Sequence, residues 1–402
     1  MGRVLFTWEL GGGLGHLMRI RPLAERLAAR GDEVALMLRD LSRAATIFAG
    51  LQVRYLQAPF KHNRSADRID SPSTLAHVLY NTGFANPAEL RVLAAAWRSV
   101  YELFQPDLIV FDHSPTAMLA ARGRRSKLAV IGNGFCCAAD LDHMPDWRPW
   151  MKKDPQKLHC DEQQVVQNAN QVLQSHGQPP LARLAELYTQ VDATLLTTFR
   201  ELDAVPQRPA AEYWGEWTTP FGKPPQWPEG DGKRIFAYVK PFKSLPLVLS
   251  ELVRRRLPAI VYAGSLDGRL VQQFRAPTLR FESEPVDVSA AAQQCGLAIL
   301  NATHGTTLSM LLRGTPLLMF PLNLEQRITA ENVVRLGAGL SFDGATCQDA
   351  ASPLDALLTD PKFTRAAQKF AQEYAGFDSS KQLERATARL AALLPTGQTI
   401  ET

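Results

Sequence analysis

The sequence of 402 residues is poor in cysteine and carries no large surplus of charge of either sign. Its 5 cysteines are few and odd in number, which excludes a disulfide framework and favours reduced thiols. Lysine and arginine number 44 against 40 aspartates and glutamates, so the formal net charge is only +4. A surplus this small over the whole chain does not indicate a nucleic-acid-binding surface.

Long hydrophobic runs are also missing. No run of about 18 or more apolar residues occurs, so no transmembrane helix is predicted. The chain opens on a strand pattern at residues 4–8 and shows neither the basic start nor the cleavage site of a signal peptide. We therefore expect a cytoplasmic protein, and contact with a membrane surface through an amphipathic helix stays open.

Short apolar runs alternate with helix-period stretches in both halves of the chain. This alternation predicts parallel β-α-β units, because buried parallel strands read as nearly continuous apolar runs. Strands are expected at residues 3–8, 33–39, 53–57, 107–112, 127–132, 193–199, 235–239, 259–263, 278–282, 297–301 and 317–320. Helices are expected at residues 16–30, 87–104, 115–122, 160–176, 244–255, 288–295, 306–312 and 325–336, with a strongly helical tail over 362–394.

The chain is expected to form two Rossmann-like, doubly wound domains that face each other across a cleft. The first domain is assigned to residues 1–215 and the second to residues 233–375. Between them, residues 216–232 form a linker rich in proline and glycine. Residues 376–402 are expected to form a C-terminal helix that packs back towards the first domain.

A glycine-rich turn follows the first expected strand and leads into a helix. Gly12, Gly13 and Gly15 stand just before His16. Clustered glycines let a backbone approach a ligand closely. A helix N-terminus disfavours imidazolium, so His16 would stay neutral and able to act as a base. The alternative is that His16 only caps the helix.

Asp112 ends another strand of the same expected sheet. A carboxylate at that place could orient His16 and stabilise its charged form. The alternative is that Asp112 caps the helix that follows it. The cysteines and histidines between residues 136 and 160 match no zinc-binding spacing, and we expect no metal site.

In the second half, a turn rich in small residues and hydroxyls opens a helix, which is typical of an anion site and suits a diphosphate. The alternative is an ordinary capped turn. The next turn contains Glu325 and Gln326, whose polar groups suit sugar hydroxyls. The alternative is that these two residues are only the polar side chains common at a helix N-terminus. The candidate donor-binding residues are Lys240, Asn301, His304, Gly305, Thr306, Thr307, Ser309, Glu325 and Gln326.

With these motifs, the chain resembles, nearly end to end, the GT-B glycosyltransferases of the UDP-glycosyltransferase type. Gly15-His16 and the segment at residues 30–34 are similar to the family's Gly-His turn and its RGHEV segment. The spacing of the family's donor motif is kept by Thr306, Leu311, Gly314, Pro316, Gln326, Ala330, Gly337 and Gly339. The resemblance implies the α/β GT-B fold and an inverting hexosyltransferase, with His16 as general base and Asp112 as its partner.

The implied reaction moves a sugar from a nucleotide-diphosphate donor to a hydroxyl or amine of a small-molecule or glycan acceptor. The donor motif nevertheless departs from the family: Asn301 stands for its phosphate-binding histidine and Ser309 for its ribose-binding glutamate. Lys240 and His304 could supply the lost positive charge. The donor is expected to be UDP- or dTDP-linked, because a dTDP sugar lacks the ribose 2′-hydroxyl and depends least on that glutamate.

No further cofactor is expected. The altered donor loop keeps a second hypothesis open, a non-catalytic GT-B protein that binds a sugar nucleotide or assists a partner glycosyltransferase. A third hypothesis, a GT-B epimerase or phosphorylase, finds no clear pattern of acids or of a cofactor lysine.

Overall fold

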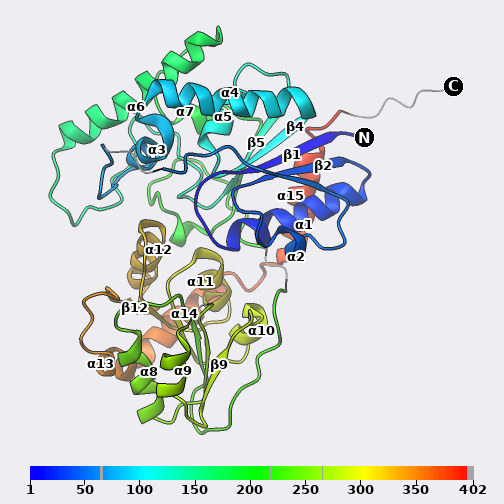
Figure 1. Cartoon of the computed structure of the whole chain (residues 1–402). Helices are drawn as coiled ribbons and strands as arrows, with labels where there is room; N and C mark the ends of the chain where they lie inside the picture. The colour runs from blue at the N-terminus through cyan, green and yellow to red at the C-terminus, as the bar shows by residue number, and fades with distance from the viewer. Residues whose placement is uncertain (64–66, 218–219, 265, 396–402) are drawn as a thin grey trace. The chain divides into compact units, whose positions relative to one another are not determined.

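The computed structural model describes residues 1–63, 67–217, 220–264 and 266–395. It divides into two units, each with its own sheet and core (Figure 1). Unit 1 comprises Met1–Trp217 and Ser379–Thr402, and unit 2 comprises Thr218–Asp378. Thr218 and Thr219 of the expected linker, and residues 396–402 of the expected C-terminal helix, lie outside the described residues.

Unit 1 holds a six-stranded parallel sheet in the order β3-β2-β1-β4-β5-β6. This is the strand order of a Rossmann sheet, in which ligands bind where the order reverses, between β1 and β4. In register, Trp8 at the end of β1 pairs with Asp112 at the end of β4. The strands are β1 (Arg3–Trp8), β2 (Glu33–Leu38), β3 (Arg54–Gln57), β4 (Leu108–Asp112), β5 (Lys127–Gly132) and β6 (Ala193–Leu196).

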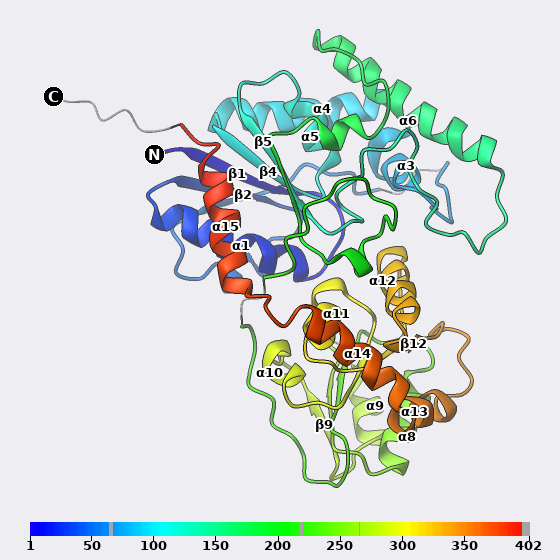
Figure 2. The same cartoon turned by 180° about the vertical axis from the view of Figure 1, so that it is seen from behind.

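Helices cover this sheet, and their ends follow local sequence signals. One of them begins where Asn86 accepts hydrogen bonds from the amides of Ala88 and Glu89 beside Pro87, and ends where Gln105 takes a left-handed conformation. The last helix of the chain, α15, packs against α1 (Figure 2). The helices are α1 (Gly15–Ala29), α2 (Ala44–Ile47), α3 (Leu75–Leu79), α4 (Pro87–Phe104), α5 (Pro115–Ala121), α6 (Pro155–Ser175), α7 (Glu186–Thr189) and α15 (Ser379–Ala391).

Unit 2 repeats the plan with the order β12-β11-β10-β7-β8-β9, so its reversal lies between β7 and β10. Tyr238 and Leu300, at the ends of these two strands, are in register. The strands are β7 (Ile235–Tyr238), β8 (Ala259–Tyr262), β9 (Leu279–Glu282), β10 (Leu297–Leu300), β11 (Leu317–Met319) and β12 (Gly339–Ser341). The helices are α8 (Leu245–Arg254), α9 (Gly268–Gln273), α10 (Val288–Ala292), α11 (His304–Leu311), α12 (Leu324–Arg335), α13 (Ala351–Thr359) and α14 (Pro361–Glu373).

The helical tail expected over residues 362–394 is two helices rather than one. It breaks after α14, where Tyr374 leaves helical geometry and Gly376 follows before α15 begins. Because α14 belongs to unit 2 and α15 to unit 1, the break lies where the chain returns to unit 1.

Residues of the expected linker pack against one unit or the other. Trp217 is buried in unit 1. Lys223 forms a parallel bridge with Val286 in unit 2. Gly222, at φ +98°, lies so close to this segment that a Cβ would be 2.4 Å from the carbonyl oxygen of Pro285. Only glycine fits this backbone comfortably.

Candidate active site

The edge of unit 1 where β1 and β4 end brings His16 and Asp112 together. His16 is the second residue of α1, and Asp112 is the last residue of β4. His16 Nδ1 lies 2.9 Å from Asp112 Oδ1, and both side chains are buried. A neutral imidazole that donates its Nδ1–H to the carboxylate carries the lone pair on Nε2. The arrangement therefore presents Nε2 as a proton acceptor.

Gly11, the first glycine of the same turn, clears the space at that nitrogen. Its φ is +82°, and a Cβ at this position would lie 2.6 Å from His16 Nε2. No described atom lies within 4 Å of the corresponding positions at Gly12, Gly13 and Gly15. The run of glycines was the available signal, but the sequence does not say which glycine faces the histidine.

The capping alternatives for His16 and Asp112 do not match the geometry. The N-cap of α1 is Leu14, and the His16 ring bonds to Asp112 instead. The first amides of α5, those of Thr116 and Ala117, bond to Glu9 Oε2 at 3.0 and 3.4 Å. Glu9 is fully buried, and this burial raises the pKa of its carboxyl to about 8. Asp112 is therefore not needed as the cap of α5.

Two further charged residues adjoin the pair, and the sequence analysis had singled out neither. Arg19 Nη1 lies 3.5 and 3.4 Å from the two carboxylate oxygens of Asp112. Arg19 Nη2 lies 3.6 Å from Glu216 Oε2. Burial opposes ionisation of Asp112, yet the charges of His16 and Arg19 hold its pKa below the usual value. Burial raises the pKa of Glu216 to about 7, against the pull of Arg19.

A row of rings runs from His16 across unit 1. Trp8 stacks on His16 with centroids 5.0 Å apart, and His113 lies parallel to His16 at 6.5 Å. Phe135 meets His113 edge-on at 5.8 Å and stacks on Trp147 at 4.6 Å. His113 Nδ1 and Trp147 Nε1 are buried and have no hydrogen-bond partner among the described residues. Burial lowers the pKa of His113 to about 3, so this ring is neutral at ordinary pH.

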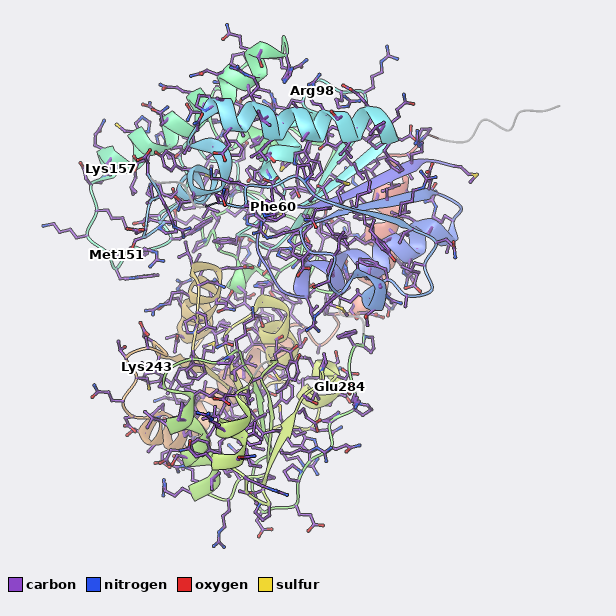
Figure 3. The ribbon with its side chains drawn as sticks, viewed as in Figure 1. Phe60, Arg98, Met151, Lys157, Lys243 and Glu284 are labelled. Carbon is purple, nitrogen blue, oxygen red and sulfur yellow. The ribbon has the colours of Figure 1, made fainter. Side chains whose placement is uncertain are left out.

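The segment between β5 and α6 changes character beyond Trp147. Met144 and Trp147 are buried, whereas Trp150 and Met151 are exposed. Figure 3 shows Met151 on this segment and Lys157 at the start of α6, both at the edge of unit 1. Only the first part of the segment therefore contributes to the packed rings.

In unit 2, the candidate donor loop joins β10 to α11. Asn301 Oδ1 accepts a hydrogen bond from the Lys240 amide, and Asn301 Nδ2 donates to the Phe320 carbonyl oxygen at 2.8 Å. The side chain thus ties together the segments that follow β7, β10 and β11. Ala302 next to it is buried with φ +61°. Asn301 is a structural tie of this edge of the sheet, a role that its sequence position alone does not reveal.

The N-terminus of α11 follows directly. Thr303 is its N-cap residue and makes no side-chain capping bond in the described structure. The first hydrogen bond within the helix joins the Thr307 amide to the Thr303 carbonyl, so the amides of residues 304–306 have no partner in the helix itself. His304 is buried, and Thr307 Oγ1 is buried with no hydrogen-bond partner among the described residues.

Other candidate donor residues are engaged within unit 2. Ser309 Oγ donates to the Gly305 carbonyl at 3.0 Å, and Gln326 Oε1 accepts from the Leu322 amide at 2.8 Å. Glu325 is half-buried in the first turn of α12, and Lys240 is exposed after β7. Thr306 and Gly305 are half-buried in the first turn of α11.

The described residues contain no group of three or more His, Cys, Asp or Glu side chains that could hold a metal ion. Within the same residues, every helix is too short or too polar to cross a membrane.

No protein-family model matches the chain. The chain is 25% identical to a PGL/p-HBAD biosynthesis glycosyltransferase of Mycobacterium tuberculosis, over 93% of this chain and 90% of that protein. It is 29% identical to a PGL/p-HBAD biosynthesis rhamnosyltransferase of Mycobacterium bovis, over 92% of this chain and 84% of the relative.

Solved structures match along almost the whole chain. The calicheamicin glycosyltransferase CalG4 superposes with a TM-score of 0.70 at 16% identity, covering 98% of this chain and 99% of its own. The spinosyn rhamnosyltransferase SpnG, complexed with thymidine diphosphate, superposes with a TM-score of 0.67 at 18% identity, covering 96% and 100%. The structural likenesses confirm the expected GT-B fold, and the sequence relatives confirm the expected enzyme class, a glycosyltransferase.

Proposed function

We propose that this GT-B glycosyltransferase transfers its sugar with inversion at the anomeric carbon, and that His16 is the general base. The observation that carries the proposal is the pairing of His16 Nδ1 with Asp112 Oδ1 at 2.9 Å, together with the space that Gly11 leaves at Nε2. Deprotonation of an attacking hydroxyl by a positioned histidine contributes about 10²–10⁴-fold in rate.

In the proposed step, the acceptor oxygen attacks the anomeric carbon while its proton passes to His16 Nε2. The bond from the anomeric carbon to the diphosphate oxygen breaks, and the nucleoside diphosphate leaves with the electron pair. Asp112 holds the imidazole in the orientation that exposes Nε2 and stabilises the imidazolium as it forms. The low pKa of Asp112 keeps this carboxylate ionised for that role.

The leaving diphosphate is assigned to the N-terminus of α11 in unit 2. Amides of the first helical turn and the positive end of the helix dipole favour a phosphate there. The hydroxyl of the half-buried Thr306 is an added donor, and the exposed Lys240 adds a point charge, whereas the Thr307 hydroxyl is buried. Asn301 contributes indirectly, since its two hydrogen bonds fix the backbone that presents these groups.

A dTDP-linked sugar is the preferred donor in this proposal, with a UDP-linked sugar as the second candidate. Ser309 stands where the family holds ribose with a glutamate, and its hydroxyl already bonds to Gly305. A nucleotide without a ribose 2′-hydroxyl loses least from that change. The relative named as a rhamnosyltransferase and the neighbour that binds thymidine diphosphate support a dTDP-linked 6-deoxyhexose. Glu325 is proposed to bind its hydroxyls.

The acceptor is proposed to be a small molecule or glycan whose reacting hydroxyl is attached to an aromatic or apolar group. The support is the row of rings beside His16. Rings of this kind contact flat apolar groups well.

The direct experiment incubates the full chain with dTDP- and UDP-linked hexoses and a panel of phenolic and alicyclic alcohols. Mass spectrometry detects transfer, and the proton coupling at the anomeric carbon of the product gives its configuration. The proposal expects an anomeric configuration opposite to that of the donor. Retained configuration would overturn the inverting mechanism, and binding of these sugar nucleotides without any transfer would favour the non-catalytic alternative.

A further inference from the structure

Arg19 and Glu216 extend the pair formed by His16 and Asp112, because Arg19 adjoins both carboxylate oxygens of Asp112 and Glu216 adjoins Arg19. Arg19 lies one helical turn after His16 in α1, so the two side chains share one face of the helix. The Arg19 guanidinium lies 3.4 Å from Asp112 Oδ2 and 3.6 Å from Glu216 Oε2. All four side chains are buried, so water does not screen their charges effectively.

Glu216 is held in place by its neighbour in the chain. The Trp217 indole Nε1–H donates to the Arg19 carbonyl oxygen at 3.1 Å, and Trp217 is buried. This bond fastens Trp217, the last residue of the first segment of unit 1, to α1 at the backbone of Arg19. The carboxylate of Glu216 is therefore built into the same cluster as Asp112.

The remaining titratable groups around His16 are neutral or face elsewhere. Burial keeps His113 neutral by lowering its pKa to about 3, and burial keeps the Cys137 thiol protonated by raising its pKa to about 12. Glu9 caps α5, and burial raises its pKa to about 8, so it is mostly neutral at pH 7. Arg39 donates to the Glu9 carbonyl oxygen. The charges that face His16 most directly are those of Asp112 and Arg19. The charge of Glu216 joins them in the fraction of molecules in which this carboxyl, with its pKa of about 7, is ionised.

We propose that Arg19 and Glu216 are positioning residues that set the proton affinity of His16 in opposite directions through Asp112. Arg19 attracts the charge of Asp112 and so weakens the support that this carboxylate gives to a protonated His16. Glu216 attracts the guanidinium in turn and restores part of that support. The catalytic consequence rests on the proposed function, whereas the effect on protonation of His16 does not depend on it.

Substitution of the two residues should therefore shift the pH at which His16 takes up its proton in opposite directions. Glu216→Gln keeps the shape and removes the negative charge that this carboxyl carries when it is ionised, so His16 should take up its proton at a lower pH than in the wild type. Arg19→Gln removes a positive charge, so His16 should take up its proton at a higher pH. Loss of the permanent charge of Arg19 should move the titration midpoint by about one unit or somewhat less. The shift in Glu216→Gln should be smaller, because the Glu216 carboxyl has a pKa of about 7 and is ionised in only part of the molecules. A purely structural role for either residue predicts no such pair of opposite shifts.

The test is an NMR titration of the full chain with isotope-labelled histidine, in which His16→Gln identifies the His16 signal by its loss. Glu162→Gln is the matched control, because Glu162 is another buried glutamate of unit 1, in α6, and accepts a hydrogen bond from the Met144 amide. The proposal expects a downward shift in Glu216→Gln, an upward shift in Arg19→Gln and no shift in Glu162→Gln. Shifts of the same sign, or a Glu216→Gln shift no larger than that of the control, would overturn it.

Arg19→Gln leaves two buried carboxylates without their cation, so this variant risks unfolding. Glu216→Gln carries the test alone if that happens, and the double variant Arg19→Gln with Glu216→Gln should return the midpoint towards the wild-type value. In the kinetics, the acid limb of kcat/KM should follow the same signs with the KM for donor unchanged. If His16→Ala keeps full activity while the NMR shifts appear, the proposed function fails and this inference stands; if His16→Ala is inactive and no shifts appear, the inference alone fails.

Discussion

The backbone of Gly11 passes directly beside His16 Nε2, so that a single methyl group at position 11 would lie 2.6 Å from this nitrogen. The other ring nitrogen of His16 bonds to Asp112. The absence of a side chain at Gly11 thus leaves His16 Nε2, the proposed proton acceptor, open to a substrate atom.

Gly11→Ala should therefore lower kcat/KM by roughly 10²-fold or more, because the added methyl occupies the place proposed for the acceptor hydroxyl. The residue also has a positive φ of +82°, so the substitution should cost about 1–2 kcal/mol of stability. Gly13→Ala is the matched control: its φ is +96°, but no described atom lies near its Cβ position. Equal loss of activity in the two variants would attribute the effect to backbone strain and not to the blocked nitrogen.

Asn301→Ala should destabilise unit 2 by about 2 kcal/mol, because two backbone groups lose their partners at the ends of the strands. Affinity for a nucleoside diphosphate should fall with it, since the backbone before α11 loses its anchor. Urea unfolding and calorimetry with dTDP measure the two effects. Ser309→Ala, which removes only a bond to the preceding turn of its own helix, should change stability by less than about 0.5 kcal/mol. If Asn301→Ala left the stability unchanged, the result would contradict the role of Asn301 in joining these backbone segments.

Lys240→Ala and Thr306→Val should each weaken binding of dTDP, with a different response to salt. The attraction of an exposed lysine is screened over about 10 Å at 0.1 M salt, so the loss in Lys240→Ala should shrink as salt is raised. A hydroxyl donor is far less sensitive, so the loss in Thr306→Val should persist. Lys243→Ala, another exposed lysine nearby in sequence (Figure 3), is the control. An effect of Lys243→Ala as large as that of Lys240→Ala would indicate general electrostatic attraction instead of a diphosphate contact.

The raised pKa of Glu9 predicts that the free energy of unfolding depends on pH. Its pKa in the folded chain is about 8, above the value of 4.5 for an ordinary glutamate, so the folded state binds this proton more tightly. Its contribution to the free energy of unfolding is therefore present below about pH 4.5 and is lost as the pH rises to about 8.

Glu9→Gln keeps an oxygen for the Thr116 and Ala117 amides and removes the titration. The variant should gain up to a few kcal/mol over the wild type between pH 5 and pH 8.5, measured by urea unfolding. Comparing the variant with the wild type cancels the contributions of Glu216, which has the same sign, and of His113, which has the opposite sign. A difference that does not grow with pH would contradict the raised pKa.

Most of the sheet framework could be predicted from sequence, because strands such as β1 and β10 are continuous apolar runs followed by turn residues. Short or exposed helices and strands were not predicted. β12 has three residues and begins with Gly339, and α9 buries none of its side chains, so neither leaves a periodic pattern. The helical period of the tail continues across residues 374–378 and hides the break between α14 and α15.

Within the candidate site, sequence position was enough to put forward His16 and Asp112 as a pair, since Asp112 ends β4 and His16 follows the turn after the neighbouring strand β1. It could not select Arg19, whose polar partners lie 93 and 197 positions away along the chain. Nor could sequence position assign the role of Asn301, because an asparagine at this place is equally compatible with a ligand contact and with hydrogen bonds that join backbone segments. These roles depend on which segments the fold brings side by side.

The measurement that tests the central claim most directly is sugar transfer by His16→Ala beside His77→Ala, with donor affinity measured on both. His77 is also a buried histidine of unit 1, and its Nε2 lies 3.1 Å from Asp161 Oδ2. The account predicts that His16→Ala loses about 10²–10⁴-fold in kcat with the donor dissociation constant nearly unchanged, while His77→Ala stays within a few-fold of the wild type. Transfer by His16→Ala at close to the wild-type rate would contradict the account and remove His16 from the reaction.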